Sequence, residues 1–237
     1  MEEANKRIIR RVPRSELGWI GTDESGKGDF FGPLVIAGVY MDKNRMERLK
    51  NLHIRDSKKI SDNVIMQMDY RIRTTCPYSV VVIGPEKYNL LYDKMRNLNL
   101  LLAWGHARVI ENILLRIECP KAVSDQFGDE SYIKNALMEK GKKISLKQMP
   151  QGETDFAVAA ASILARAEFL RRLSYLSLEA GLALPKGSSA FVDEVAKKVL
   201  EKFGKENLVK FVKLHFKNTD KILCPQPPGD TKTQSPN

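Results

Sequence analysis

The hydrophobic and polar positions of the chain form blocks that predict strands in its first part and mainly helices afterwards. Apolar, β-prone residues fill 17–22 and 34–40, and a glycine-rich polar bend at 23–29 separates them. A strand, a tight connection and a second strand favour an antiparallel pair. The run 34–40 is apolar throughout, which is typical of a strand buried on both faces. Further strands are expected at 78–83, 122–125 and 143–148.

Helical periodicity marks the segments between and after these strands. Apolar residues recur every three or four positions over 99–118, and the alanine-rich start of 156–176 predicts a long, closely packed helix. Other helices are expected at 44–52, 62–73, 189–203 and 206–216. This order of elements predicts an α/β or α+β fold on a mixed sheet, with a helical C-terminal part.

The 237 residues suit one globular domain between two polar ends. Residues 1–16 are basic and contain Pro13, so we expect a flexible arm, and the Pro-, Thr- and Gln-rich tail 223–237 is expected to be disordered. The globular domain is then 17–222. No apolar run approaches the roughly 20 residues that span a bilayer, and no secretory signal opens the chain, so we expect no membrane association.

Charge and cysteine content narrow the class of partner. The formal net charge is +10, which favours a polyanion, nucleic acid first and an anionic membrane surface second; the alternative is that it only maintains solubility. The three cysteines, Cys76, Cys119 and Cys224, are too far apart for a zinc site or a disulfide framework. They indicate incidental thiols in a reducing compartment and predict a cytoplasmic protein.

Acidic residues fall near the ends of predicted strands. Asp23 and Glu24 follow the first strand, Asp125 ends a later one, and Glu153 and Asp155 precede the alanine-rich helix. Any one of them alone would be taken for a solvated surface group. Strand ends aim side chains at a common point, however, and converging carboxylates repel one another unless divalent cations neutralise them. Oxygen ligands favour Mg²⁺ or Mn²⁺, and two such ions are the usual apparatus for phosphodiester hydrolysis.

Two further features suit a phosphate-containing ligand. In Gly26-Lys27-Gly28 the glycines let the backbone come close to a ligand, and successive N–H groups can face an anion. Lys58 and Lys59 are candidates for phosphate contacts. By itself the tripeptide would be an ordinary turn, and the lysines would be surface charge. Both features suggest phosphate binding only together with the candidate carboxylates.

Residues 21–37, GTDESGKGDFFGPLVIA, resemble the opening motif of the type 2 ribonucleases H. The segments DSKK at 56–59 and AAASILAR at 159–166, together with Asp125, match further blocks of that family in the same order. Within the family, the details look like ribonuclease HIII rather than HII. These details are the form Ser25…Asp29-Phe-Phe, the segments NLN at 97–99 and AWGH at 103–106, and LPKGS at 184–188.

The resemblance implies a ribonuclease H-like mixed sheet flanked by helices. It implies hydrolysis of the RNA strand of RNA/DNA hybrids with two Mg²⁺ or Mn²⁺ ions, leaving 5′-phosphate and 3′-hydroxyl ends. Asp23, Glu24 and Asp125 occupy the family's first three metal-binding positions. For the fourth, Gln151-Gly-Glu matches the family's local pattern best and favours Glu153, with Asp155 as the alternative.

The same resemblance assigns substrate recognition. Gly26, Lys27 and Gly28 match the tripeptide whose backbone reads the ribose 2′-hydroxyl in the HII branch. That branch also uses a C-terminal tyrosine at RNA–DNA junctions, and Tyr175 lies in a different block. We therefore expect poor cleavage at single embedded ribonucleotides.

Ribonucleases HIII usually carry an N-terminal substrate-binding domain. Only sixteen residues precede the first expected strand, so we expect the catalytic domain's own basic face to bind the hybrid, and the protein to act as a monomer. His106 falls on the apolar side of a predicted helix and is interpreted as a structural core residue.

Three alternatives remain open at this point. The first is HII-type activity at single ribonucleotides. The second is a nucleic-acid-binding module without catalysis, although carboxylates within a phosphate-binding face would weaken its binding. The third is a different two-metal nuclease of the same fold, against which only the glycine tripeptide and the family blocks argue.

Overall fold

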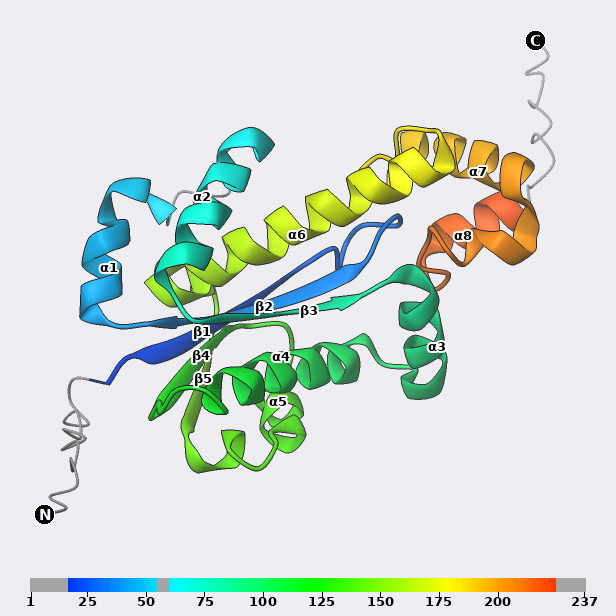
Figure 1. Cartoon of the computed structure of the whole chain (residues 1–237). Helices are drawn as coiled ribbons and strands as arrows, with labels where there is room; N and C mark the ends of the chain where they lie inside the picture. The colour runs from blue at the N-terminus through cyan, green and yellow to red at the C-terminus, as the bar shows by residue number, and fades with distance from the viewer. Residues whose placement is uncertain (1–16, 55–59, 225–237) are drawn as a thin grey trace, which may run out of the picture.

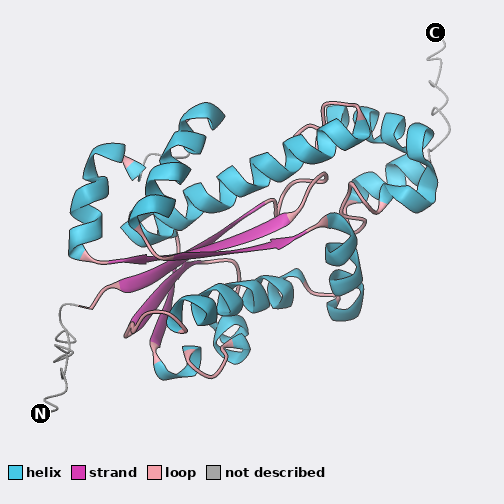
Figure 2. Cartoon of the chain, in the orientation of Figure 1, coloured by secondary structure: helices cyan, strands magenta, loops and turns pink. Residues whose placement is uncertain are grey.

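A five-stranded mixed sheet lies at the centre of the computed structural model, which describes residues 17–54 and 60–224 (Figures 1 and 2). The strands are β1 (Trp19–Ser25), β2 (Leu34–Met41), β3 (Tyr78–Ile83), β4 (Lys121–Asp125) and β5 (Ser145–Met149). Their order across the sheet is β3-β2-β1-β4-β5. β1 pairs antiparallel with β2 and parallel with β4, so the central strand joins an antiparallel half to a parallel half.

Helices cover both faces of this sheet and extend beyond one end of it (Figure 1). The α-helices are α1 (Lys43–Leu49), α2 (Asp62–Thr75), α3 (Pro85–Met95), α4 (Leu98–Leu114), α5 (Glu130–Ala136), α6 (Phe156–Ala180), α7 (Ala190–Leu208) and α8 (Lys217–Leu223). Short 3₁₀ turns are η1 (Lys50–Leu52), η3 (Gly141–Lys143) and η4 (Gly152–Thr154). Among the described residues, we find no helix with the length and apolar character needed to traverse a lipid bilayer.

Two hydrophobic cores form because successive side chains of a strand point to opposite faces of the sheet. α6 packs across β1 and β2 on one face, where its alanines are buried. α4 packs on the other face, where Ile20 and Ile36 lie among its buried residues. A side chain at Gly21 would overlap the backbone of Ala157 and Val158, so glycine is what lets α6 approach β1.

The predicted elements are largely confirmed, with two helices missed and one misplaced. All five strands lie where expected, and β1 with β2 is the predicted antiparallel pair. β1 continues to Ser25, so Asp23 and Glu24 lie within the strand rather than after it. The helices α3 and α5 were not predicted.

The helix expected at 206–216 is wrong beyond Leu208. Gly204 has a positive φ of 75° and kinks α7, which ends at Leu208. Val212 instead bridges to Phe31, and α8 begins only at Lys217. The backbone of this segment therefore pairs with the chain that follows the glycine tripeptide.

Several sequence predictions lie outside the described residues. They are the basic arm 1–16, the phosphate contacts of Lys58 and Lys59 in the 56–59 motif, and nearly all of the tail 223–237.

Candidate active site

Two adjacent carboxylates of β1 point to opposite faces of the sheet, because side chains alternate along a strand. Asp23 points toward α6, where the side chain of Ser162 hydrogen-bonds to it. Glu24 points toward α4, where its Oε2 lies 3.2 Å from Nε2 of His106. The two acids therefore have different surroundings although they are neighbours in the chain.

The third predicted acid, Asp125, comes beside Asp23 through the parallel pairing of β4 with β1. The register sets Thr22 opposite Ser124, so the two aspartates follow at neighbouring positions. The Asp125 Oδ1 atom accepts a hydrogen bond of 2.7 Å from the backbone N–H of Gly152. A side chain at Gly152 would overlap Asp125, which explains a glycine directly before Glu153.

Burial and like charge set the protonation of this cluster. The pKa of Asp23 is raised well above its usual value by burial first, then by the charge of Glu24, with Asp125 adding to it. Burial acts in the same direction on Glu24, but hydrogen bonding to His106 and the charge of Lys27 outweigh it and lower the pKa of Glu24. Asp23 thus lies beside two carboxylates whose negative charges oppose its ionisation.

This donor set fits a hard divalent cation. All three groups offer carboxylate oxygens, the ligands that Mg²⁺ and Mn²⁺ prefer, and a bound cation would remove the repulsion that raises the pKa of Asp23. In the described part of the chain, no three or more His, Cys, Asp or Glu side chains already form a group that could hold an ion. The carboxylates would therefore have to draw together around it.

The two candidates for the fourth acid have different surroundings. Asp155 is the N-cap of α6: its Oδ1 accepts from the backbone N–H groups of Ala157 at 2.9 Å and Val158 at 3.1 Å. The indole N–H of Trp19 donates to the same carboxylate at 2.9 Å. Glu153 lies in η4, which contacts β4 next to Asp125. Asp155 thus has a structural role as the cap of α6.

The glycine tripeptide forms the turn that leaves β1. Gly26 has a φ of 88°, and a side chain there would overlap the Pro33 carbonyl oxygen, so this glycine is a requirement of the turn. Gly28 faces open space, where a ligand could reach the backbone. The Lys27 ammonium lies 3.4 Å from Glu24 Oε1, and its side chain is 40 % exposed.

A buried lysine that the sequence analysis missed supports this turn. Lys213 is completely buried, and its Nζ donates to the carbonyl oxygens of Asp29 and Gly32, both at 2.7 Å. The Asp29 Oδ1 atom accepts from the Gly187 N–H at 2.6 Å, and Gly187 O accepts from the Phe30 N–H at 2.9 Å. Burial lowers the pKa of Lys213 to about 7. The only sequence signal was a lysine set between apolar residues.

Tyr175 lies far along α6 from the carboxylates. It follows Ser162 by thirteen positions, which is about 20 Å at 1.5 Å per residue. Its side chain is 65 % exposed.

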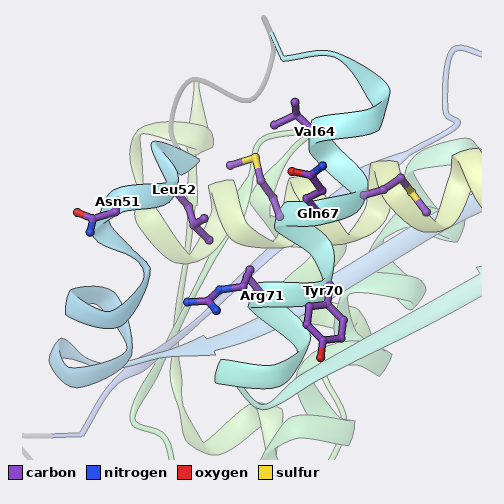
Figure 3. Close-up of a pocket in the computed structure, with 8 residues that line it drawn as sticks. Asn51, Leu52, Val64, Gln67, Tyr70 and Arg71 are labelled. Carbon is purple, nitrogen blue, oxygen red and sulfur yellow. The ribbon is translucent and has the colours of Figure 1, made fainter.

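A groove of about 770 Å³ lies elsewhere on the molecule, between η1 and α2 (Figure 3). Leu52, Val64, Tyr70 and Arg71 are among its lining residues. Of the predicted site residues that the structure describes, none lines it.

The mixed sheet in this strand order, with α6 and α4 on its two faces, has the architecture of the ribonuclease H-like class. The chain belongs to the ribonuclease HII family, whose pattern matches residues 20–219. This confirms the resemblance predicted from the 21–37 motif and its companion blocks.

Individual relatives refine this placement. The chain is 49 % identical to ribonuclease HIII of Protochlamydia amoebophila over 204 residues, covering 86 % of this chain and 68 % of the relative. It is 47 % identical to that of Chlamydia felis over 206 residues, covering 86 % and 69 %. The crystal structure of Bst-RNase HIII in complex with Mn²⁺ is similar with a TM-score of 0.82 and 32 % identity, covering 93 % and 76 %. The chain is thus a ribonuclease H endonuclease, with relatives in the HIII branch.

Proposed function

We propose that the chain hydrolyses the RNA strand of RNA/DNA hybrids with two Mg²⁺ or Mn²⁺ ions, leaving 5′-phosphate and 3′-hydroxyl ends. The observation that carries the proposal is the buried Asp23, whose pKa is raised by burial and by the charges of Glu24 and Asp125. A buried carboxylate whose ionisation is opposed by two neighbouring carboxylates is what a divalent ion would stabilise. The crystal structure of the relative Bst-RNase HIII in complex with Mn²⁺ supports the choice of metal.

Within this proposal each residue has a stated part. Asp23, Glu24, Asp125 and Glu153 would hold the ions, which supply a bound water of lowered pKa and stabilise charge on the leaving oxygen. The backbone of Gly26-Lys27-Gly28 approaches the ribose 2′-hydroxyl, which distinguishes RNA from DNA. Gly28, which faces open space, supports that approach.

The proposal includes poor cleavage at a single ribonucleotide embedded in DNA. A junction-reading aromatic ring would have to lie beside the glycine turn and the carboxylates. Tyr175 is exposed and lies about 20 Å along α6 from Ser162, which contacts Asp23. Runs of several ribonucleotides need no such ring, because each sugar offers its own 2′-hydroxyl.

The test is a panel of substrates and ions. An RNA/DNA hybrid, a DNA duplex and an RNA duplex are incubated with Mg²⁺, Mn²⁺ or EDTA. We expect cleavage of the hybrid alone, none in EDTA, and loss of several orders of magnitude in Asp125→Asn. Asp93→Asn, which alters an exposed carboxylate on α3, is the matched control and keeps full activity. Near-normal activity of Asp125→Asn would contradict the assignment, and hybrid binding without cleavage would favour a binding module.

Substrate choice is tested separately on matched duplexes with one and with four ribonucleotides in Mg²⁺. We expect efficient cleavage of the second duplex and poor cleavage of the first. Equal initial rates would show that HII-type recognition is present and would leave the hybrid activity itself standing.

A further inference from the structure

His106 is completely buried at the contact between α4 and the sheet, and its polar contacts with the described residues go to the strands that carry the candidate metal ligands. Nδ1 lies 2.8 Å from Thr22 Oγ1 on β1 and 3.4 Å from Ser124 Oγ on β4. Nε2 lies 3.2 Å from Glu24 Oε2. The ring stacks on Phe127, with 4.8 Å between centroids. This is more than the structural core residue that the sequence indicated.

The protons of this network can be assigned from its partners. An ionised carboxylate only accepts hydrogen bonds, so His106 Nε2 donates to Glu24. The Ser124 hydroxyl donates to the carbonyl oxygen of Asp125 at 2.9 Å, so its proton is not directed at the ring. Thr22 Oγ1, at 2.8 Å, is then the closest hydrogen-bond partner of Nδ1. The imidazole thus has a defined orientation, with Nε2 aimed at one carboxylate oxygen.

The strand register makes this contact set specific to the site. Thr22 and Ser124 are paired across β1 and β4, and each immediately precedes an aspartate, Asp23 or Asp125. One ring therefore contacts both strands beneath the point where their acids meet. It also holds Glu24, the acid that faces away from α6.

We infer that His106 is a positioning residue: it orients the Glu24 carboxylate and joins β1 to β4 so that these acids can bind divalent ions together. This inference rests on the proposed function of Glu24 as a metal ligand. Outer partners of this kind fix the orientation of a ligand, and their loss typically weakens metal binding or activity by about 10- to 100-fold.

Two substitutions separate positioning from packing. The amide group of asparagine can take the place of Nδ1 of histidine and hydrogen-bond to Thr22, but the side chain is too short to reach Glu24. Glutamine is one methylene longer, so its amide can donate where Nε2 does. Both remove the ring that stacks on Phe127 and both retain polarity. A role in packing alone would affect the two variants alike, whereas positioning predicts a difference between them.

The experiment measures Mn²⁺ affinity by calorimetry on the full chain without substrate. We expect His106→Asn to raise the Kd for Mn²⁺ by about 10- to 100-fold and His106→Gln to recover most of that loss. In a Glu24→Gln background, His106→Asn should have little further effect, because its action passes through Glu24. Affinity for an RNA/DNA hybrid in EDTA should stay within about twofold.

The outcomes distinguish this inference from the proposed function. Equal Mn²⁺ affinity in wild type and a folded His106→Asn, while the wild type cuts hybrids, would overturn the role of His106 alone. Absence of Mn²⁺ binding by the wild type would overturn the proposed function and this inference with it.

If His106→Asn does not fold, the wild type carries the test by ¹⁵N NMR. The His106 Nε2 resonance should shift during a Mg²⁺ titration with the midpoint of metal binding, and an unchanged resonance would overturn the inference.

Discussion

Asp23 and Glu24 are adjacent residues of one type of charge, yet their surroundings drive their pKa values in opposite directions. Burial and the charges of Glu24 and Asp125 raise the pKa of Asp23, while hydrogen bonding to His106 and the charge of Lys27 prevail over burial at Glu24. Alternation along β1 is the reason, since it directs one acid toward α6 and the other toward α4. Two neighbouring titratable groups whose pKa values are shifted in opposite directions are typical of a functional site.

The first residue-scale prediction concerns the fourth acid. Glu153→Gln should lower turnover by more than about 100-fold, because loss of a ligand exceeds the 10- to 100-fold typical of its outer partners. Asp155→Asn should keep near-normal turnover, since asparagine caps a helix as well as aspartate does. Metal-titrated kinetics compare the two, and the reverse ranking would move the role to Asp155.

Asp155→Ala serves as the companion measurement. It removes the cap of α6 and the acceptor for the Trp19 indole, so it should lower the free energy of unfolding by about 1 kcal/mol. Turnover per folded molecule should be retained. Urea unfolding with activity measured on the same samples separates these effects.

The second residue-scale prediction concerns the buried Lys213. Burial lowers its pKa to about 7, although the carbonyl oxygens of Asp29 and Gly32 favour the charged amine; the ordinary value is 10.5. Between those two values the unfolded chain binds more protons than the folded one, so the contribution of Lys213 to the free energy of unfolding rises with pH. Below pH 7 both states are protonated and that contribution is constant.

Urea unfolding from pH 6.5 to 9.5 tests this dependence by comparing wild type with Lys213→Met. The wild type should gain more than about 1 kcal/mol relative to the variant across that range, since each pKa unit corresponds to about 1.4 kcal/mol. In the folded state His215 stays neutral over this range, because burial and then the charge of Lys213 lower its pKa to about 4. In the unfolded chain it titrates alike in both proteins. Lys210→Met, at an exposed lysine nearby, should leave the pH profile unchanged. A flat difference would mean that Lys213 stays charged.

At the scale of elements, the contact between β1 and α6 determines the geometry of the site. Gly21 lets the start of α6 approach the strand, and Ser162 on the same helix then reaches Asp23. Farther along, Phe169 packs under the turn at Gly26. One helix thus supports both the carboxylates and the glycine tripeptide.

The prediction at this scale compares two glycine-to-alanine changes. Gly21→Ala should lower the free energy of unfolding by about 1–3 kcal/mol or more, because a methyl group there overlaps the α6 backbone. Gly28→Ala should leave stability nearly unchanged, since that position faces open space. Thermal unfolding measures both, and equal stability of the two variants would show that α6 can shift away from β1 at little cost.

Gly28→Ala also reports on recognition. If the backbone at Gly28 approaches the ribose, the added methyl group should raise KM for the hybrid while stability stays constant. An unchanged KM would place substrate contact elsewhere in the turn.

The sequence predicted most of these elements because their signals are local. Alternation and apolar runs located the strands, and alanine spacing located α6. α3 was missed although Gly84 and Pro85 form a standard helix start, because little of the helix belongs to the core: of its residues only Pro85 and Tyr88 are buried. The expected helix at 206–216 failed because Phe211 and Lys213 bond to the backbone at 30–32, which a local pattern does not reveal.

The residues of the candidate site were likewise predictable from the sequence only in part. Asp23, Glu24 and Asp125 could be selected from the sequence, since strand ends and family blocks are visible in it. The contacts of His106 and Lys213 could not, because their partners lie some 80 and 180 positions away in the chain. Local patterns identify the candidate ligands, and the fold reveals the residues that hold them.

At the scale of the whole molecule, the net positive charge of the chain contrasts with the acidic side chains of the candidate site. The net charge of +10 attracts a polyanion, while the candidate site itself is a cluster of acids. Basic residues elsewhere on the surface would have to hold the phosphates, and divalent ions would make the acidic cluster compatible with them. Binding without metal should then depend on the basic surface alone.

The last prediction follows from that separation and concerns hybrid binding in EDTA, where no strand is cut. If about five phosphates are contacted, the slope of log K against log salt should lie near −4 to −5, at about 0.9 per phosphate. Lys27→Ala should reduce the slope by about 1 if this half-exposed lysine leaves Glu24 to contact a phosphate. Lys134→Ala, at an exposed lysine of α5 that pairs with Glu130, should leave the slope unchanged. Fluorescence anisotropy between about 50 and 300 mM salt measures all three slopes. Over this range the Debye length falls from ~14 to ~6 Å. A nearly flat response of the wild type would mean that the positive charge serves solubility and that contacts other than phosphate carry the binding.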